Sequence, residues 1–139
     1  MSTFDILRTY TMLELRPSEV FFSQATIKDH FRRGYRTIYE TLEQCTNDPC
    51  TVDNIPKITV CKKDGKWFTL DNRRLWVFRQ LEAKGLLSSI SVFESDSIPE
   101  CKYNTMNGGT SVEILQVWKP NNPPLIDNLL LMLKKTHFY

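Results

Sequence analysis

Residues 58–85 read ITVCKKDGKWFTLDNRRLWVFRQLEAKG, and this stretch decides the fold. The β-branched run Ile58–Cys61 predicts a strand, and Trp67–Leu70 predicts a second strand that returns beside it. An Asp-Gly pair stands between them, which is the strongest short signal for a hairpin turn. From Arg73 to Lys84 the apolar residues recur at helical spacing, and Gly85 is typical of the residue after a helix. The stretch therefore predicts a hairpin that leads directly into a helix.

Upstream of this stretch, the pattern changes several times over a short length of chain. Met12–Arg16 reads as a short strand, and Ser18–Phe22 reads as a loop or a short extended turn. Apolar residues recur every fourth position after Ser23, which predicts a helix over Ser23–Phe31. Thr37–Cys45 predicts a second helix by the same periodicity. Residues 46–54 are turn formers and predict a loop.

Downstream, two further strands and a last helix are predicted. Ile90–Phe93 reads as a strand, and a long polar segment follows it. Val112–Trp118 partly alternates between apolar and polar residues, which indicates another strand. Leu125–Lys135 predicts a helix that carries an acid early and lysines late, as the helix dipole favours. Its apolar surface is wider than one amphipathic stripe, so we expect it to contact the domain, a second copy in a homodimer, or a protein partner.

The order of these elements predicts an α+β (α/β) fold with a mixed sheet flanked by helices. A chain of 139 residues has the length of one domain, so we expect a single domain over residues 1–139. Residues 12–94 form its predicted core. Residues 110–139 form a predicted C-terminal extension that adds a strand and a helix.

Composition narrows the class of protein. Hydrophobic residues make up 41% of the chain and aromatic residues 12%, which excludes disorder as the main state. No apolar run reaches the roughly 18–20 residues of a membrane span, so no membrane partner is expected. The net charge is only +2, so the overall charge does not by itself indicate a polyanionic partner.

The cysteines and the N-terminus indicate an intracellular protein. The first residues contain an acid and no apolar signal segment, so we expect a cytoplasmic or nuclear location with reduced thiols. The spacing Cys45-x4-Cys50 is too loose for a zinc motif, and no metal site is expected from the cysteines. The full set is Cys45, Cys50, Cys61 and Cys101.

The turn Asp71-Asn72-Arg73-Arg74 holds the chemistry that the sequence offers. It stands where the central helix is predicted to begin, and a helix N-terminus carries partial positive charge and unpaired N–H groups. Two arginines there are electrostatically unfavourable, and a bound anion such as phosphate would relieve them. The alternative is that Asp71 caps the helix and pairs with one arginine. The spacing leaves both interpretations open.

Residues 55–60, the Asp-Gly turn and residues 67–78 together resemble the core of the ParB/sulfiredoxin superfamily, and the likeness extends over about residues 12–94. The resemblance implies a small α/β domain that binds a nucleotide such as ATP or CTP with Mg²⁺, its phosphate lying over the arginine-containing turn. Hydrolysis or transfer of the phosphate is an associated activity in the superfamily. Asn72 stands where sulfiredoxins carry their catalytic cysteine, so sulfinic acid reduction is not expected. The paired arginines are similar to the turn that grips the triphosphate in ParB proteins.

The resemblance also implies roles for individual residues. Arg74 would hold a phosphate by a bidentate pair, and Arg73 would stabilise transferred charge. Asn72 would offer its backbone N–H to the phosphate, and Asp71 would cap the helix or hold a metal ion. Asp71 and Arg73 are thus the candidate catalytic residues. The candidate phosphate-binding residues are Asn72, Arg73 and Arg74, with Gln24 and Thr26 from the upstream predicted helix.

Two features favour a second function, a module without catalysis that binds nucleic acid or protein. The superfamily has glycines just before the turn, whereas this chain has Leu70 and Asp71 there. Basic residues also surround the hairpin, with Trp67 and Phe68 between them, and lysines with aromatic side chains suit nucleic acid. Because side chains alternate along a strand, only one of these two aromatic residues can face solvent. The basic residues around the hairpin are Lys57, Lys62, Lys63 and Lys66.

Overall fold

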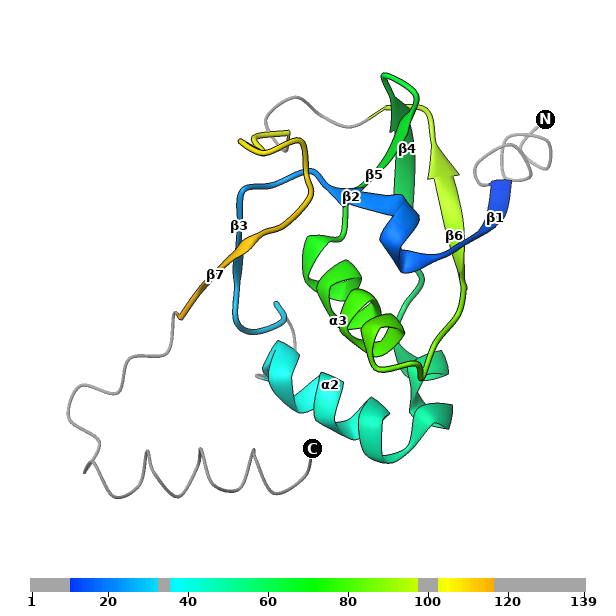
Figure 1. The fold of residues 1–139 in the computed structure, drawn as a ribbon, viewed down its shortest axis with the longest axis vertical. Helices are drawn as coiled ribbons and strands as arrows, with labels where there is room; N and C mark the ends of the chain where they lie inside the picture. The colour runs from blue at the N-terminus through cyan, green and yellow to red at the C-terminus, as the bar shows by residue number, and fades with distance from the viewer. Residues whose placement is uncertain (1–10, 33–35, 98–102, 117–139) are drawn as a thin grey trace, which may run out of the picture.

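Five strands form one mixed sheet in the order β1–β6–β4–β5–β2 (Figure 1). The computed structural model describes residues 11–32, 36–97 and 103–116. β1 is antiparallel to β6, β6 is parallel to β4, β4 is antiparallel to β5, and β5 is parallel to β2. This sheet and its helices confirm the predicted α+β class. The strands are β1 (Thr11–Leu15), β2 (Val20–Phe22), β4 (Thr59–Lys63), β5 (Lys66–Thr69) and β6 (Ile90–Ser95).

The hairpin between β4 and β5 forms where the Asp-Gly pair predicts it. Lys63 and Lys66 are the last paired residues of the two strands, which leaves a two-residue turn. Asp64 has a φ of 51° and Gly65 a φ of 78°. Positive φ at both central residues matches the twist of the flanking strands. This turn sets the register of the hairpin and thereby the point at which the following helix begins.

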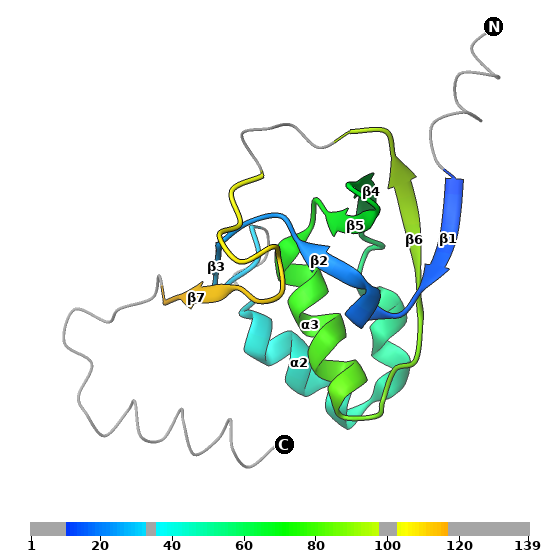
Figure 2. The ribbon, with the colours of Figure 1, turned by 45° about the horizontal axis from the view of Figure 1, so that its top comes forward.

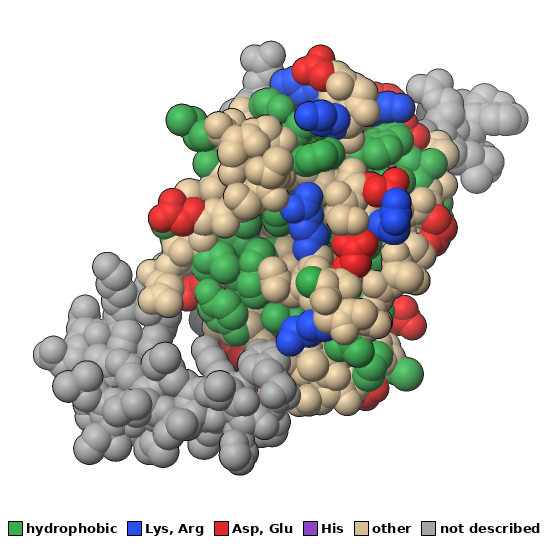
Figure 3. Space-filling view, viewed as in Figure 1, with side chains coloured by type: hydrophobic (Ala, Val, Ile, Leu, Met, Phe, Trp, Pro, Cys, Tyr) green, Lys and Arg blue, Asp and Glu red, His purple; other side chains and the backbone are tan. Residues whose placement is uncertain are grey.

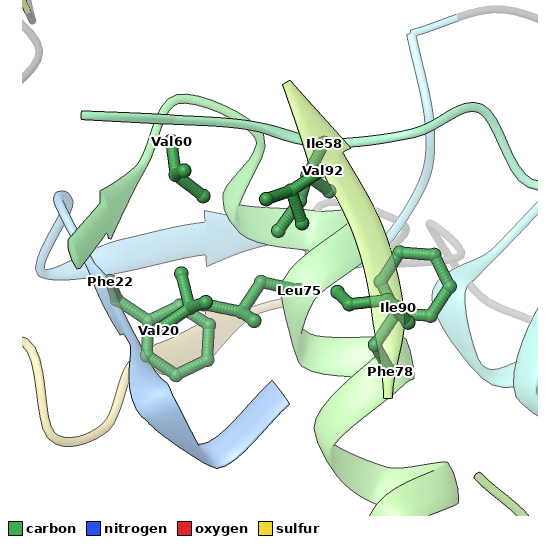
Figure 4. Packing of buried hydrophobic residues seen from close by; sticks show 8 residues of the cluster. All are labelled: Val20, Phe22, Ile58, Val60, Leu75, Phe78, Ile90 and Val92. Carbon is green, nitrogen blue, oxygen red and sulfur yellow. The ribbon is translucent and has the colours of Figure 1, made fainter. Parts of the chain in front are cut away.

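Helix α3 (Asn72–Ala83) follows β5 directly and lies between the sheet and helix α2 (Ile38–Asn47) (Figures 1 and 2). Its Leu75 and Phe78 pack against the inward face of the sheet, as Figure 4 shows. Its Val77 and Leu81 join the second cluster, which includes α2. The central helix is therefore apolar on two sides. The first cluster consists of Val20, Phe22, Ile58, Val60, Leu75, Phe78, Ile90 and Val92, and the second of Ile27, Ile38, Leu42, Cys45, Val77 and Leu81.

Helix α2 matches the predicted second helix within two residues at its end. The Thr37 hydroxyl accepts a hydrogen bond from the Glu40 N–H at 3.0 Å, and the Glu40 carboxylate accepts one from the Thr37 N–H at 3.2 Å. This reciprocal capping fixes the start of the helix. The loop predicted over residues 46–54 contains a 3-10 helix, η2 (Pro49–Asn54).

The helix predicted over Ser23–Phe31 is wrong. Its centre is a strand, β3 (Thr26–Lys28), which pairs in parallel with β7 (Glu113–Leu115) in a separate two-stranded sheet. Thr26 is half-buried, Ile27 is buried and Lys28 is exposed, which is an alternation with the period of a strand. The short apolar spacing fitted both periods, and a partner strand about 90 residues away along the chain decided between them.

Two other predictions need adjustment. A 3-10 helix, η1 (Pro17–Glu19), overlaps the start of the segment Ser18–Phe22, and the last three residues of that segment form β2 at one end of the main sheet. The strand predicted over Val112–Trp118 is only the three residues of β7 in the part of the chain described. The predicted helix Leu125–Lys135 lies outside the described residues. No helix among residues 11–32, 36–97 and 103–116 is long and apolar enough to cross a membrane.

The segment before β7 is hydrogen-bonded to the end of β2 and to Ser23, which follows β2. The Phe22 N–H donates to the Gly109 carbonyl at 2.9 Å. The N–H groups of Asn104 and Thr105 donate to the Ser23 carbonyl at 2.8 and 3.0 Å. This segment, residues 103–112, is called the strap below. It supplies backbone partners to the last strand of the sheet, whose edge would otherwise carry unpaired groups.

Arg79 of α3 ties the strap and η1 to the helix. Its Nη1 donates to the Thr110 carbonyl at 2.9 Å, its Nε to the Pro17 carbonyl at 3.4 Å, and its Nη2 to the Val20 carbonyl. The guanidinium carbon lies 4.7 Å from the centre of the Phe22 ring. Burial lowers the pKa of Arg79. One side chain thereby joins three segments that are far apart in sequence.

Candidate functional site

The candidate site is the start of α3, where Asp71 occupies the N-cap position. Its carboxylate does not cap the helix. The Asp71 Oδ2 accepts a hydrogen bond from the Thr59 N–H at 2.7 Å, and its Oδ1 lies 3.6 Å from the Arg74 Nη2. The expectation that Asp71 caps the helix is therefore wrong, whereas the predicted pairing with an arginine is present.

The two helices differ in how they begin. α2 has the reciprocal cap of Thr37 and Glu40, whereas α3 has neither a side-chain cap nor an acidic residue in its first turn. The first N–H groups of a helix have no intrahelical partner, and they carry the positive end of the helix dipole. The start of α3 therefore keeps the positive potential of its uncapped N–H groups, which the Asp71 carboxylate beside Arg74 offsets in part.

Three arginines add to that potential. Burial lowers the pKa of Arg73, and the positive charges of Arg32 and Arg74 lower it further. The Arg73 Nη1 donates to the His30 carbonyl at 2.9 Å, and the Arg74 Nη1 donates to the Lys57 carbonyl at 3.0 Å. Arg32 and Arg74 are thus close enough to repel Arg73, and an anion bound beside Arg73 would relieve this repulsion.

The side chain of Asn72 has a structural role. Its Oδ1 accepts hydrogen bonds from the Ser23 N–H at 2.9 Å and the Gln24 N–H at 3.4 Å. Its Nδ2 donates to the Ser23 hydroxyl at 3.0 Å. The side chain is buried and joins the end of β2 to the first turn of α3. Only the backbone N–H of Asn72 is left for the role proposed from the sequence.

The structure brings some of the other candidate residues together and not others. The backbone of Gln24 contacts Asn72, so Gln24 lies beside the turn. Thr26 lies on β3 and lines a different hollow, between β3, β7 and the strap. In the part of the chain described, no group of three or more His, Cys, Asp and Glu side chains could hold a metal ion.

Sequence reasoning missed two members of this neighbourhood, Arg32 and Asp29. The Asp29 side chain is 8% exposed, and its Oδ1 lies 3.1 Å from the His30 Nδ1. Asp29 falls within the predicted helix Ser23–Phe31 and Arg32 follows it, so their place near the turn depended on how this segment folds. The isolated bridge between His30 and Thr37 instead turns this segment back toward α2, and the His30 carbonyl receives the Arg73 guanidinium.

Asn72→Ala is expected to lower the free energy of unfolding by about 2 kcal/mol, because it leaves the buried Ser23 N–H without its acceptor. Urea denaturation measures the change. Asn54→Ala serves as the control, since Asn54 is exposed at the end of η2 and should lose much less. Equal losses in the two variants would show that the Asn72 side chain is not the link that the geometry describes.

Comparisons with known proteins identify neither a family nor a relative. A scan against protein-family models finds no match, and a search of the curated proteins finds none. The function is therefore argued from the geometry of the site and from the resemblance of the residue pattern.

Proposed function

We propose that the chain binds a phosphate group of a nucleotide at the first turn of α3. The observation that carries this proposal is that α3 begins without a side-chain cap while Arg73 and Arg74 lie in its first turn. An uncapped helix start donates N–H groups toward an anion, and its dipole favours negative charge. Arg32 adds a third positive group, whose charge acts on Arg73.

The arginines keep donors for a ligand. A guanidinium group has five N–H donors. One Nη1 hydrogen bond to a carbonyl is described for each of Arg73 and Arg74. These bonds orient the side chains. The other donors of Arg73 suit the bidentate geometry of a phosphate, whereas the Arg74 Nη2 also lies 3.6 Å from the Asp71 Oδ1, so a phosphate would share Arg74 with Asp71. Arg74 would hold the phosphate, and Arg73 would stabilise charge on a transferred group.

The ligand class comes from the resemblance, which implies ATP or CTP with Mg²⁺. The residues present suit a phosphate, because the turn offers arginines and an uncapped helix start, and two hollows of the described part of the chain lie at other places. One is lined by α2 and Arg36, and the other by β3, β7 and the strap. Binding would therefore rest mainly on the phosphates.

A specific observation favours the second candidate, a module without catalysis. Asp71 uses one carboxylate oxygen on the Thr59 N–H, and the other lies near Arg74. Such a carboxylate positions the turn and is poorly placed to act as a base. The Asn72 side chain is likewise hydrogen-bonded to Ser23. Phosphate binding without hydrolysis or transfer is consistent with both observations.

A thermal-shift series with ATP, ADP, CTP and GTP, each with Mg²⁺, tests the proposal. A nucleotide at a hundredfold excess over its Kd should stabilise the protein by about 2.7 kcal/mol. Arg74→Gln should abolish the shift, because Arg74 lies in the first turn of α3. Its melting temperature without ligand should fall modestly, because the hydrogen bond to the Lys57 carbonyl and the contact with Asp71 are lost. Arg16→Gln is the matched control, since Arg16 pairs with Glu19 and its side chain is 68% exposed.

Two outcomes would contradict the proposal. One is the absence of any nucleotide-dependent shift, which would leave the interaction module as the function to pursue. The other is a shift that Arg74→Gln retains in full, which would place the nucleotide elsewhere on the chain.

A further inference from the structure

The outward face of the main sheet carries a cluster of aromatic side chains with lysines over them. The register pairs Phe21 with Phe68, and Phe68 with Cys61, so these residues share one face. Their neighbours Val20 and Val60 point into the core against α3. Side chains alternate along a strand, so Phe21 and Phe68 face away from the helix. The lysine–aromatic face is defined here as Phe21, Lys63, Lys66, Phe68 and Tyr103.

The aromatic rings of this face lie against one another. The ring centres of Phe21 and Phe68 are 5.8 Å apart, and those of Phe68 and Tyr103 are 5.1 Å apart in an edge-on arrangement. Phe68 is 3% exposed. Phe21 and Tyr103 flank it and are half-buried, so each of these residues keeps some exposed surface.

Lysine ammonium groups stand over the flanking rings. The Lys63 Nζ lies 3.5 Å from the centre of the Tyr103 ring, and the Lys66 Nζ lies 5.3 Å from the centre of the Phe21 ring. On the other face of the hairpin, the Lys62 Nζ lies 5.3 Å from the centre of the Trp67 ring. Among the described residues, none of these three lysines forms a salt bridge.

The positive charge and the apolar surface meet at one end of the molecule. Figure 3 shows Lys and Arg side chains beside hydrophobic ones at the end formed by the β4–β5 hairpin. The carboxylates nearby in the sheet include Asp64 in the turn and Asp96 just after β6, both exposed, and Glu94 on β6, which is paired with Val60. The lysines of the hairpin therefore outnumber its single acid.

We propose that the lysine–aromatic face binds single-stranded nucleic acid. Lysines neutralise backbone phosphates, and accessible rings stack on unpaired bases, whatever their sequence. In a duplex the bases are already paired and stacked, so the rings would gain nothing there. This inference is independent of the phosphate site, because it uses none of the residues at the start of α3.

Fluorescence anisotropy with labelled 12-nucleotide dT and U strands tests the proposal, and a 12-base-pair duplex and a polyglutamate peptide serve as comparison probes. Binding should weaken with salt. The double variant Lys63→Gln/Lys66→Gln should reduce the slope of log K against log salt by about 1.4, at about 0.7 per phosphate contact. The control Lys28→Gln/Lys84→Gln removes the same charge from exposed lysines elsewhere and should leave the slope nearly unchanged.

A second double variant tests the rings separately from the charge. Phe21→Leu/Tyr103→Leu keeps apolar cover over Phe68 but removes two stacking surfaces. It should weaken binding of the single strands roughly tenfold or more without changing the salt slope. Its melting temperature shows whether the face is intact.

Each of the following results would overturn the proposal. The single strands fail to bind, or the duplex binds as tightly as they do. The control lysine variant weakens binding as much as Lys63→Gln/Lys66→Gln, which would indicate that nucleic acid is attracted by the overall positive charge and not by the lysine–aromatic face. Polyglutamate competes as well as dT, which would indicate an acidic protein partner.

Discussion

Gly109→Ala is expected to destabilise the protein by about 3 kcal/mol or more, from left-handed strain together with overpacking. Gly109 has a φ of +80°, and a Cβ added there would lie 2.3 Å from the Phe22 carbonyl oxygen and 2.9 Å from the Phe21 Cβ. The backbone of β2 cannot yield without losing its pairing with β5. The strap must therefore move away from the sheet, and the hydrogen bond from the Phe22 N–H to the Gly109 carbonyl is lost with it.

Gly108→Ala is the matched control for this prediction. Gly108 has a φ of +70°, but nothing lies within 4 Å of a Cβ added there. It should cost only the strain of a left-handed side chain, about 1–2 kcal/mol. Urea denaturation measures both variants, and hydrogen exchange at the Phe22 amide should accelerate only in Gly109→Ala. Equal losses in the two variants would show that the strap does not rest on β2 as closely as described.

Arg79→Met is expected to lower the free energy of unfolding by about 3 kcal/mol, because hydrogen bonds to charged groups are worth about 1.5–3 kcal/mol each and their losses are not additive. Methionine keeps part of the packing against Phe22 but supplies no donor to the carbonyls of Pro17, Val20 and Thr110. Urea denaturation with an unchanged m-value measures the loss.

Two further variants separate geometry from charge at this position. Arg79→Lys keeps the charge but presents a point ammonium, which cannot reach three separated carbonyls, so its loss should be intermediate. Arg16→Met removes an arginine whose side chain is 68% exposed and should have little effect. If Arg79→Met costs no more than Arg16→Met, Arg79 does not join the three segments.

Local sequence signals predicted the hairpin and the two helices well. The Asp-Gly turn and the periodicities of α2 and α3 all act over a few residues, so the chain needs no distant partner to express them. The predicted start of α3 at Arg73 differs from the observed start at Asn72 by one residue. The strands β4, β5 and β6 were likewise found, with ends that differ by one or two residues.

The two short strands β2 and β3, whose partners are remote, were predicted poorly, whereas β1, whose partner β6 is also remote, matches the predicted Met12–Arg16 within one residue. Val20–Phe22 is three residues long, and its pairing with β5 lies 47 positions along the chain, as Val20 with Trp67 shows. β3 was taken for part of a helix because three apolar residues at helical spacing are too few to settle the period. The alternation in the burial of Thr26, Ile27 and Lys28 becomes visible only once β7 is beside them.

The location of the candidate site was predictable from the sequence, but the contacts of its side chains were not. The sequence located the turn and its arginines, and the resemblance supplied the nucleotide as an expectation. The partners of each side chain depended on the fold. Asp71 accepts a hydrogen bond from the Thr59 N–H, Asn72 accepts one from the Ser23 N–H, and Arg73 donates one to the His30 carbonyl. Each partner lies at least 12 residues away along the chain.

By itself, the sequence of this protein determined a mixed α+β domain, built around a hairpin that runs into a helix with arginines at its start. Hydrophobic periodicity, turn residues and caps are local and carry that information in a few neighbouring positions. The tertiary structure decided which segment covers the edge of β2, why Gly109 must lack a side chain, and why α3 begins without a side-chain cap. Those features depend on packing and hydrogen bonds between distant segments, and such contacts exist only after the chain has folded.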